Sequence, residues 1–208
     1  MSLSICTTYY NSHKALASQE QRIRSCKHDY VIVDDGSPTP LQIDYARVYR
    51  IPVDIFFNLD AINLSVLKAT GDYIFRQDLD HWADYDKMAE LELPEKTIFH
   101  FERLCNNKFL PPNPSHILIR KADYIAIGGW NTIYSGYYGC CDNDFVRRAQ
   151  QMGYTFKLAP MLIEASTRLS TPDITRDPRH NRKIYNTNPA CNTNWNIDYE
   201  TVTDRVER

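Results

Sequence analysis

Short apolar segments alternate with amphipathic ones along the first half of the chain, and this rhythm restricts the fold more than any other feature of the sequence. The segments Leu3–Tyr9, Tyr30–Val33 and Tyr73–Arg76 have the length and composition of buried strands. Helical patterns lie between them at residues 13–26 and 61–69. Strands joined by helices form parallel sheets with right-handed crossovers. The sequence therefore predicts an α/β fold.

The remaining elements follow the same reading of periodicity and turn residues. We expect a helix over Pro40–Tyr49, strands at Val53–Phe57, Thr97–Phe101, His116–Arg120 and Thr155–Ile163, and helices at Lys121–Ile127 and Asp142–Met152. An aromatic loop is expected at residues 134–139. From about residue 166 the chain becomes polar and contains several prolines, which predicts an extended segment or a lid and not a second domain.

Charge and composition exclude several classes of protein. The 208 residues carry 24 Lys and Arg against 26 Asp and Glu, a balance that argues against binding a nucleic-acid backbone. No apolar run approaches the ~20 residues of a transmembrane helix, and the first residues lack the pattern of a signal peptide. The 6 cysteines form no Cys-x-x-Cys pair, which favours reduced thiols. We therefore expect a cytoplasmic protein with no nucleic-acid partner.

Polar and acidic residues follow three of the expected strands. Thr7–Asn11 closes the first strand, Asp34 and Asp35 close the second, and Asp78 and Asp80 follow Tyr73–Arg76. In open α/β sheets, ligands bind beyond the carboxyl ends of the strands. Two carboxylates separated by one residue can approach one divalent cation, which in turn can bridge phosphate oxygens. For either acidic pair alone, turn capping and solvation is the plainer interpretation, but their joint placement favours a nucleotide site.

Four segments of the first half together resemble family 2 type glycosyltransferases of the GT-A fold. They are Ser4–Asn11, Val31–Ser37, Ala61–Ile74 and Asp78–Asp80, in the family's order and spacing. The resemblance extends over about residues 3–165. It implies a mixed, mostly parallel sheet flanked by helices and a catalytic domain at 1–165, with a nucleotide-binding half at 1–80 and an acceptor half at 81–165. The tail at 166–208 would pack on the site or close over it.

The second half is similar to the acceptor side of β-1,4-galactosyltransferases and related N-acetylgalactosaminyltransferases. The matching residues are Gly128-Gly129-Trp130, Tyr138–Phe145, Arg148 and Gly153. Asp142 stands at the position of the family's catalytic carboxylate, which implies a general base for the acceptor hydroxyl. A simpler role is also open to it, because an acidic residue in the first turn of a helix is stabilised by the helix dipole.

The resemblance also implies a donor site, a metal site and a reaction. The residues implied for binding the nucleotide sugar are Thr8, Tyr10, Asp35, Asn63, Asp78, Trp130 and Tyr138, and those implied as ligands of Mn²⁺ or Mg²⁺ are Asp80, Asp78 and His180. His81 is expected to point away from the ion. The implied activity is inverting transfer of a hexose from a UDP-sugar, such as UDP-galactose or UDP-N-acetylgalactosamine, to a saccharide or glycoconjugate acceptor.

Two departures from the family pattern keep other functions open. Ile62 replaces an arginine of the family, and Cys141 replaces the glutamate before the catalytic carboxylate. Losing these contacts is compatible with a non-catalytic homologue that binds a nucleotide or a sugar. A nucleotidyltransferase is a further alternative. It would need a glycine-rich phosphate loop with a basic residue after the first strand, and Thr7–Asn11 offers none.

Overall fold

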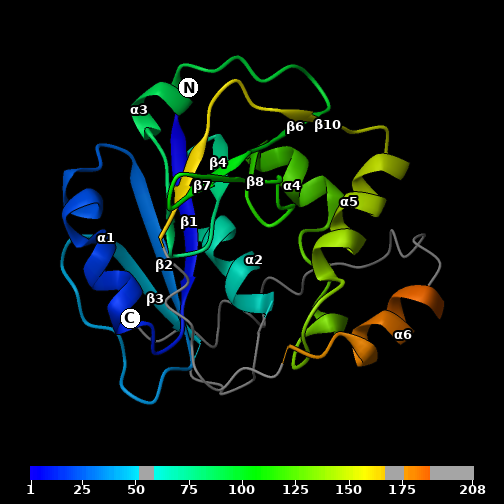
Figure 1. Ribbon diagram of the computed structural model, residues 1–208, viewed down its shortest axis with the longest axis horizontal. Helices are drawn as coiled ribbons and strands as arrows, with labels where there is room; N and C mark the ends of the chain where they lie inside the picture. The colour runs from blue at the N-terminus through cyan, green and yellow to red at the C-terminus, as the bar shows by residue number, and fades with distance from the viewer. Residues whose placement is uncertain (52–58, 167–175, 188–208) are drawn as a thin grey trace.

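The protein is built around a central sheet of seven strands, seen nearly edge-on in Figure 1. The structure is a computed structural model that describes residues 1–51, 59–166 and 176–187. The strand order is β10-β6-β9-β4-β1-β2-β3. Their bounds are β1 Leu3–Tyr9, β2 Asp29–Asp35, β3 Arg47–Ile51, β4 Tyr73–Arg76, β6 Thr97–His100, β9 Ile117–Arg120 and β10 Thr155–Leu158. Only β9 runs antiparallel to its neighbours β4 and β6, so the expectation of a mixed, mostly parallel sheet is confirmed.

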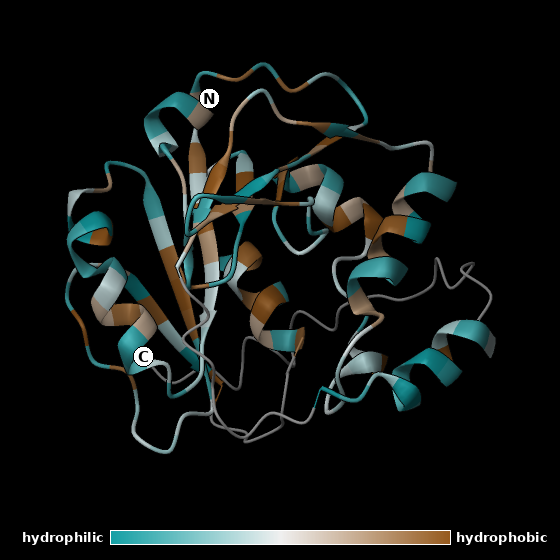
Figure 2. Cartoon of the chain, in the orientation of Figure 1, coloured by the Kyte–Doolittle hydropathy of each residue, from teal (hydrophilic) through white to brown (hydrophobic). Residues whose placement is uncertain are grey.

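Helices cover both faces of this sheet because successive strand residues point to opposite sides. Ile5 packs with α1 (His13–Ser25) and α3 (Tyr85–Ala89) in one buried cluster. Its neighbour Cys6 packs with α2 (Leu59–Lys68), α4 (Lys121–Ile127) and α5 (Cys141–Gln151) in another. Figure 2 shows the strands mostly in brown and white, with α6 (Arg179–Thr187) mostly hydrophilic. Burial on both faces explains why these strands are apolar throughout their length.

A second sheet of four strands lies beside the first. Its order is β5-β11-β7-β8, with bounds His81–Trp82, Ile163–Ala165, Arg103–Cys105 and Lys108–Leu110. The single strand expected over Thr155–Ile163 is therefore wrong: β10 belongs to the large sheet and β11 to the small one. Pro160 lies between them and cannot donate a ladder hydrogen bond, which explains the break.

The helix expected over Pro40–Tyr49 is also wrong, because residues 40–46 are irregular and β3 follows. The cause lies in the turn after β2. The buried Asp34 carboxylate accepts hydrogen bonds from the backbone of Ser37 (3.0 Å) and Leu41 (2.9 Å), and Arg50 donates to it at 3.1 Å. These bonds fix the chain in an extended path beside β2. The strand expected at 53–57 lies outside the described residues.

The cysteines that the structure describes form no disulfide bond with one another. Cys6, Cys26, Cys105, Cys140 and Cys141 are free thiols, and Cys191 lies outside the described residues. Among the residues that the structure describes, no helix combines the length and apolar character that crossing a bilayer requires.

Gly71 joins α2 to β4 and lies directly against the backbone of β1. A Cβ atom at this position would lie 2.8 Å from the carbonyl oxygen of Ser2 and 2.8 Å from the amide nitrogen of Ser4. Neither backbone atom can move without breaking the pairing of β1 with β4. We expect Gly71→Ala to lower the free energy of unfolding by about 1–3 kcal/mol, the usual cost of overpacking. Urea denaturation measures the change, and an unaltered midpoint would contradict the close approach.

Candidate active site

Several residues expected to bind the donor lie at the carboxyl ends of β1, β2 and β4. The register pairs Thr8 with Val33 and Tyr9 with Asp34, so the ends of β1 and β2 are adjacent. Thr8 is half-buried, Tyr10 is 38% exposed, and Asp35 is buried as the last residue of β2. The structure therefore brings these three expected donor residues to one edge of the sheet.

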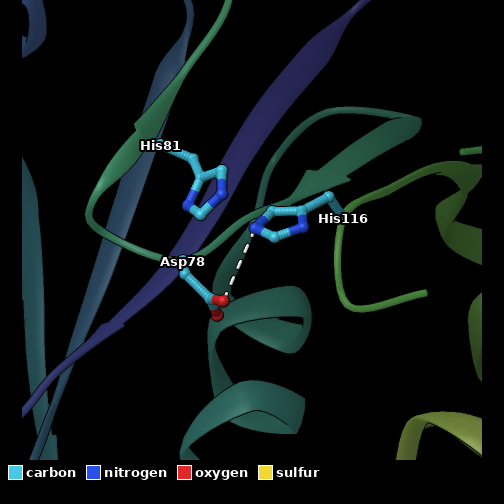
Figure 3. Close-up of side chains that lie close together, drawn as sticks. All are labelled: Asp78, His81 and His116. Atoms are coloured by element: carbon cyan, nitrogen blue, oxygen red, sulfur yellow. Dashed lines mark ion pairs between the residues drawn. The ribbon is translucent and has the colours of Figure 1, made fainter. Parts of the chain in front are cut away.

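Asp78, His81 and His116 form a compact cluster just beyond β4. One potential ligand atom from each residue lies within 4.8 Å of the others. Asp78 Oδ2 is 3.4 Å from His116 Nε2, and the two imidazole rings have their centroids 3.9 Å apart. Figure 3 shows the two rings and the carboxylate converging. Both histidines are buried, whereas the Asp78 side chain keeps 43% of its surface exposed, so the cluster opens to the outside through the carboxylate.

The protonation states in this cluster suit a divalent cation. Burial lowers the pKa of His116 to about 4, so its imidazole is neutral at physiological pH. Burial alone would raise the pKa of Asp78, but the charge on Arg76 and the contact with His116 hold it well below its usual range. A carboxylate beside a neutral imidazole is a donor set that transition-metal ions accept.

Arg76 links this cluster to the expected catalytic carboxylate. Its buried guanidinium forms an ion pair with Asp78 Oδ1 at 2.7 Å and donates a hydrogen bond to the carbonyl oxygen of Ser115 at 2.6 Å. Its charge acts on Asp142 as well as on Asp78, and the two carboxylates also act on each other. Asp78 and Asp142 therefore share one electrostatic environment although 63 positions separate them in the sequence (142 − 78 − 1).

Asp142 lies in the first turn of α5 and is held by one strong contact. Trp130 Nε1 donates to Asp142 Oδ1 at 2.8 Å. Burial raises the pKa of Asp142, and the charge of Asp78 adds to the rise, while Arg76 and the Trp130 hydrogen bond oppose it. A carboxylate with raised pKa is a better proton acceptor near neutral pH than an ordinary one.

Asn63 and Trp130, both expected to contact the donor, are completely buried in the structure. Asn63 donates to the Trp130 carbonyl (2.8 Å) and accepts from the Trp130 amide (2.9 Å) and from the Tyr124 hydroxyl (2.7 Å). The Trp130 ring stacks on Phe145, with centroids 4.4 Å apart. Neither side chain has surface left for a ligand. In this structure Asn63 holds the backbone of Trp130, and the Trp130 side chain holds Asp142.

A buried ion pair in α5 holds this helix against the turn that precedes Trp130. Arg148 pairs with Asp144 at 2.7 Å, and its other nitrogens donate to the carbonyls of Ile127 and Gly129, each at 2.6 Å. Both charged side chains are at most 4% exposed. The arginine therefore holds the Gly128–Gly129 turn, and with it Trp130, in a fixed position relative to Asp142.

The other expected metal ligands lie apart from the cluster. Asp80 Oδ1 contacts His81 Nδ1 at 2.7 Å, so this carboxylate faces the histidine and not the common centre. His180 stacks on Tyr137 with centroids 3.6 Å apart. The candidate group found among the described residues contains Asp78 but neither Asp80 nor His180. His81, in turn, belongs to the group, so the expectation that it points away is wrong.

The described part of the polar tail is the helix α6, which fastens the aromatic loop. Asn181 is fully buried, and its amide donates to the carbonyls of Tyr134 (3.0 Å), Tyr137 (2.8 Å) and Gly139 (2.9 Å). Tyr138 is half-buried in that loop, with the Arg176 guanidinium 6.0 Å from its ring. An extended conformation was expected here, and the helix differs from it because Pro178 and Asp177 begin a helical turn.

Arg76 and His116 are the site residues that sequence reasoning missed. His116 enters the site because β9 runs antiparallel beside β4, with Ile117 opposite Arg76. That pairing is a property of the sheet order and leaves no local pattern in the sequence. Arg76 did have a signal, since a charged residue ends an otherwise apolar strand just before the acidic turn.

Cys140 adopts a backbone conformation that favours glycine. It precedes α5 with φ = 66°, in the left-handed region. A residue with a side chain pays roughly 1–2 kcal/mol in this conformation. We expect Cys140→Gly to raise the free energy of unfolding by up to about 1 kcal/mol, measured by urea denaturation. A destabilised variant would mean that packing of the thiol outweighs the backbone strain.

Comparison with known proteins identifies the fold. No family model and no curated protein matches the sequence. Residues 1–349 of TarS from S. aureus, in complex with UDP-GlcNAc, superpose with a TM-score of 0.67 at 15% identity, over 88% of this chain and 64% of TarS. The mannosyltransferase PcManGT from Pyrobaculum calidifontis, in complex with GDP-Man and Mn²⁺, superposes with a TM-score of 0.59 at 14% identity. The superposition covers 83% of this chain and 58% of PcManGT.

GalNAc-T7 with UDP, GalNAc and Mn²⁺ gives a TM-score of 0.54 at 10% identity, over 85% of this chain and 45% of that structure. The chain thus spans less than two thirds of the length of each of these three structures. All three are glycosyltransferases of one architecture, with the same kind of mixed sheet flanked by helices. The protein described here has the GT-A fold.

Proposed function

We propose that the protein is a metal-dependent glycosyltransferase that moves a hexose from a UDP-sugar to a hydroxyl group of a saccharide or glycoconjugate, with inversion. The observation that supports this best is the placement of Asp78, paired with the buried Arg76 at 2.7 Å at the end of β4 beside β1, together with Asp142, which Trp130 holds in the first turn of α5. One carboxylate is positioned as a base and the other stands in a cluster suited to a cation. The three similar structures contain UDP-GlcNAc, GDP-Man, or UDP with GalNAc.

The proposed step is a single displacement. Asp142 accepts the proton of the acceptor hydroxyl, whose oxygen forms a bond to the anomeric carbon as the bond from that carbon to the diphosphate breaks. Attack from the face opposite the leaving group inverts the configuration. Trp130 holds Asp142 Oδ1, so Oδ2 is the atom that takes the proton. A divalent cation held at the Asp78 cluster would stabilise the negative charge of the leaving diphosphate.

The donor is assigned to the nucleotide half at 1–80 and the acceptor to 81–165, with the tail at 166–208 beside them. In this arrangement Asp35 accepts from the uracil N–H, Thr8 and Tyr10 lie against the base, and Tyr138 faces the sugars. All three of Thr8, Tyr10 and Asp35 stand at one edge of the sheet, which supports a common ligand. UDP-galactose and UDP-N-acetylgalactosamine are the donors we propose first.

A donor screen tests this function. The full chain is incubated with UDP-galactose, UDP-N-acetylgalactosamine, UDP-GlcNAc and GDP-mannose, with Mn²⁺ or with EDTA, and nucleotide release is measured. We expect Mn²⁺-dependent release from one UDP-sugar, increased by saccharide acceptors. UDP binding in a calorimeter without release from any donor would favour the non-catalytic homologue. Absence of both binding and release would exclude the glycosyltransferase function.

A further inference from the structure

We infer that the divalent cation is held by Asp78, His81 and His116, with Asp80 orienting His81, and that the site selects ions that accept imidazole over Mg²⁺. The role of the ion in sugar transfer rests on the proposed function, but its binding does not. The inferred ligands differ from the Asp78, Asp80 and His180 set that the sequence resemblance implied. They come from the turn after β4, from β5 and from the residue before β9.

Two buried imidazole nitrogens point into this cluster without hydrogen-bond partners. His81 Nε2 and His116 Nε2 are both inaccessible and make no hydrogen bond to a described residue, and His116 Nε2 has only the ion-pair contact with Asp78 Oδ2 at 3.4 Å. The two side chains are 6% and 0% exposed. A buried polar atom without a partner is costly, and two that face one carboxylate are unusual in a stable core. One cation between them would satisfy both nitrogens.

The far side of each of the three residues is held in place. Asp80 contacts His81 Nδ1 at 2.7 Å, which fixes the proton on Nδ1 and leaves the Nε2 lone pair for a ligand bond. The Ser115 hydroxyl lies 3.4 Å from His116 Nδ1, and Arg76 forms an ion pair with Asp78 Oδ1 at 2.7 Å. Metal-binding histidines and carboxylates typically have such partners on their second polar atom. The arrangement leaves one free donor atom on each residue: Nε2, Nε2 and Oδ2.

The distance between donor atoms agrees with a bound ion. Bonds of about 2.1 Å at tetrahedral angles place neighbouring ligand atoms about 3.4 Å apart. Asp78 Oδ2 and His116 Nε2 are 3.4 Å apart in the structure, and all three donor atoms lie within 4.8 Å of one another. A small adjustment of His81 would complete the set.

The chemistry of the donors determines which ions bind. Two imidazole nitrogens and one carboxylate oxygen suit Mn²⁺, Fe²⁺, Co²⁺ and Zn²⁺. Mg²⁺ prefers oxygen ligands in a near-ideal octahedron and would have only one protein oxygen here. The second nearby carboxylate, Asp80, already contacts His81. The structure thus favours ions that bind nitrogen.

Titration of the full chain with Co²⁺, in the absence of nucleotide, tests the inference by visible absorption of the bound ion. We expect Co²⁺ to bind, Zn²⁺ to displace it, and a hundredfold excess of Mg²⁺ to leave it in place. His81→Gln and His116→Gln should each weaken Co²⁺ binding at least tenfold, and Asp80→Asn by about 10- to 100-fold. The matched control His28→Ala, on the surface beside Asp86, should bind Co²⁺ as the wild type does.

His180→Ala separates the two ligand sets. We expect it to bind Co²⁺ normally, and a tenfold loss there with normal binding in His116→Gln would overturn the inference in favour of the Asp80 and His180 set. Circular dichroism shows whether each variant folds, and the gain in melting temperature on adding Zn²⁺ gives a second readout if a variant is less stable. Absence of Co²⁺ binding to the wild type also overturns the inference. Binding that depends on the three residues, without nucleotide release from any donor, would retain the metal site and remove the transferase function.

Discussion

Replacement of Asp142 by asparagine is expected to lower the rate of sugar transfer by about 10²- to 10⁴-fold, the usual contribution of a positioned general base. The Trp130 N–H can still donate to the amide oxygen of asparagine, so the side chain keeps its place. What the variant loses is the ability to accept a proton. Nucleotide release in the presence of acceptor, followed over time, measures the loss. Asp44→Asn, which removes an exposed carboxylate at a distant site, is the matched control and should keep the wild-type rate.

The raised pKa of Asp142 also predicts how the transfer rate and the stability depend on pH. Because burial raises the pKa of Asp142 in the folded state, the base becomes protonated and the transfer rate falls at a pH above that of an ordinary carboxyl group, about 3.9. The ionised form also opposes folding, and this cost appears as the pH rises from the unfolded pKa through the folded one. The asparagine variant should therefore be at least as stable as the wild type at pH 7. A variant that is both active and less stable would contradict the assigned role.

Arg148→Met is expected to destabilise the protein by about 3–5 kcal/mol, because it removes one partner of a buried ion pair and leaves Asp144 with only the longer, 3.5 Å ion pair to Arg147. Asp144 is 2% exposed, and the carbonyls of Ile127 and Gly129 would lose their donors at the same time. Methionine fills a similar volume, so the cost arises from polar groups and not from a cavity. Chemical denaturation measures the change in the free energy of unfolding.

Arg179→Met is the matched control for this prediction. Arg179 also forms an ion pair with an aspartate, Asp177, but its side chain is 87% exposed. Exposed pairs contribute little to stability, so its denaturation midpoint should not change. Equal shifts for the two variants would show that burial is not the source of the effect at Arg148.

Most strands could be predicted from the sequence because burial on both faces leaves short, fully apolar segments. In β1, the neighbouring residues Ile5 and Cys6 pack into the clusters on opposite faces of the sheet. In β4, Ile74 and Phe75 do the same. Both strands therefore appear in the sequence as apolar runs. The helix expected over Pro40–Tyr49 failed for a tertiary reason: Asp34, distant by several residues, binds the backbone of Leu41 and the side chain of Arg50. Propensity within a short window contains no information about such a contact.

The candidate site was predictable where motifs stand at strand ends and unpredictable where the fold brings residues together. Asp78 and Asp142 could be singled out from their positions in the sequence, whereas their common partner Arg76 left only the weak signal of a charged residue at the end of an apolar strand. The family pattern singled out Asn63 and Trp130 but not the contacts between them, in which the Asn63 side chain holds the Trp130 backbone. His116 depends on the antiparallel pairing of β9 with β4, which no spacing along the chain reveals.

The position of β9 has a consequence for any attempt to divide the protein. This strand comes from the second half of the chain and pairs directly with β4 of the first half, so the halves at 1–80 and 81–165 meet along one strand pair within a single continuous sheet. A fragment that stops after β4 would present Ile74 and Phe75 on an unpaired edge, and such edges recruit other strands. The two halves would therefore have to be supplied together, as complementing fragments, before either could be expected to remain in solution as a monomer.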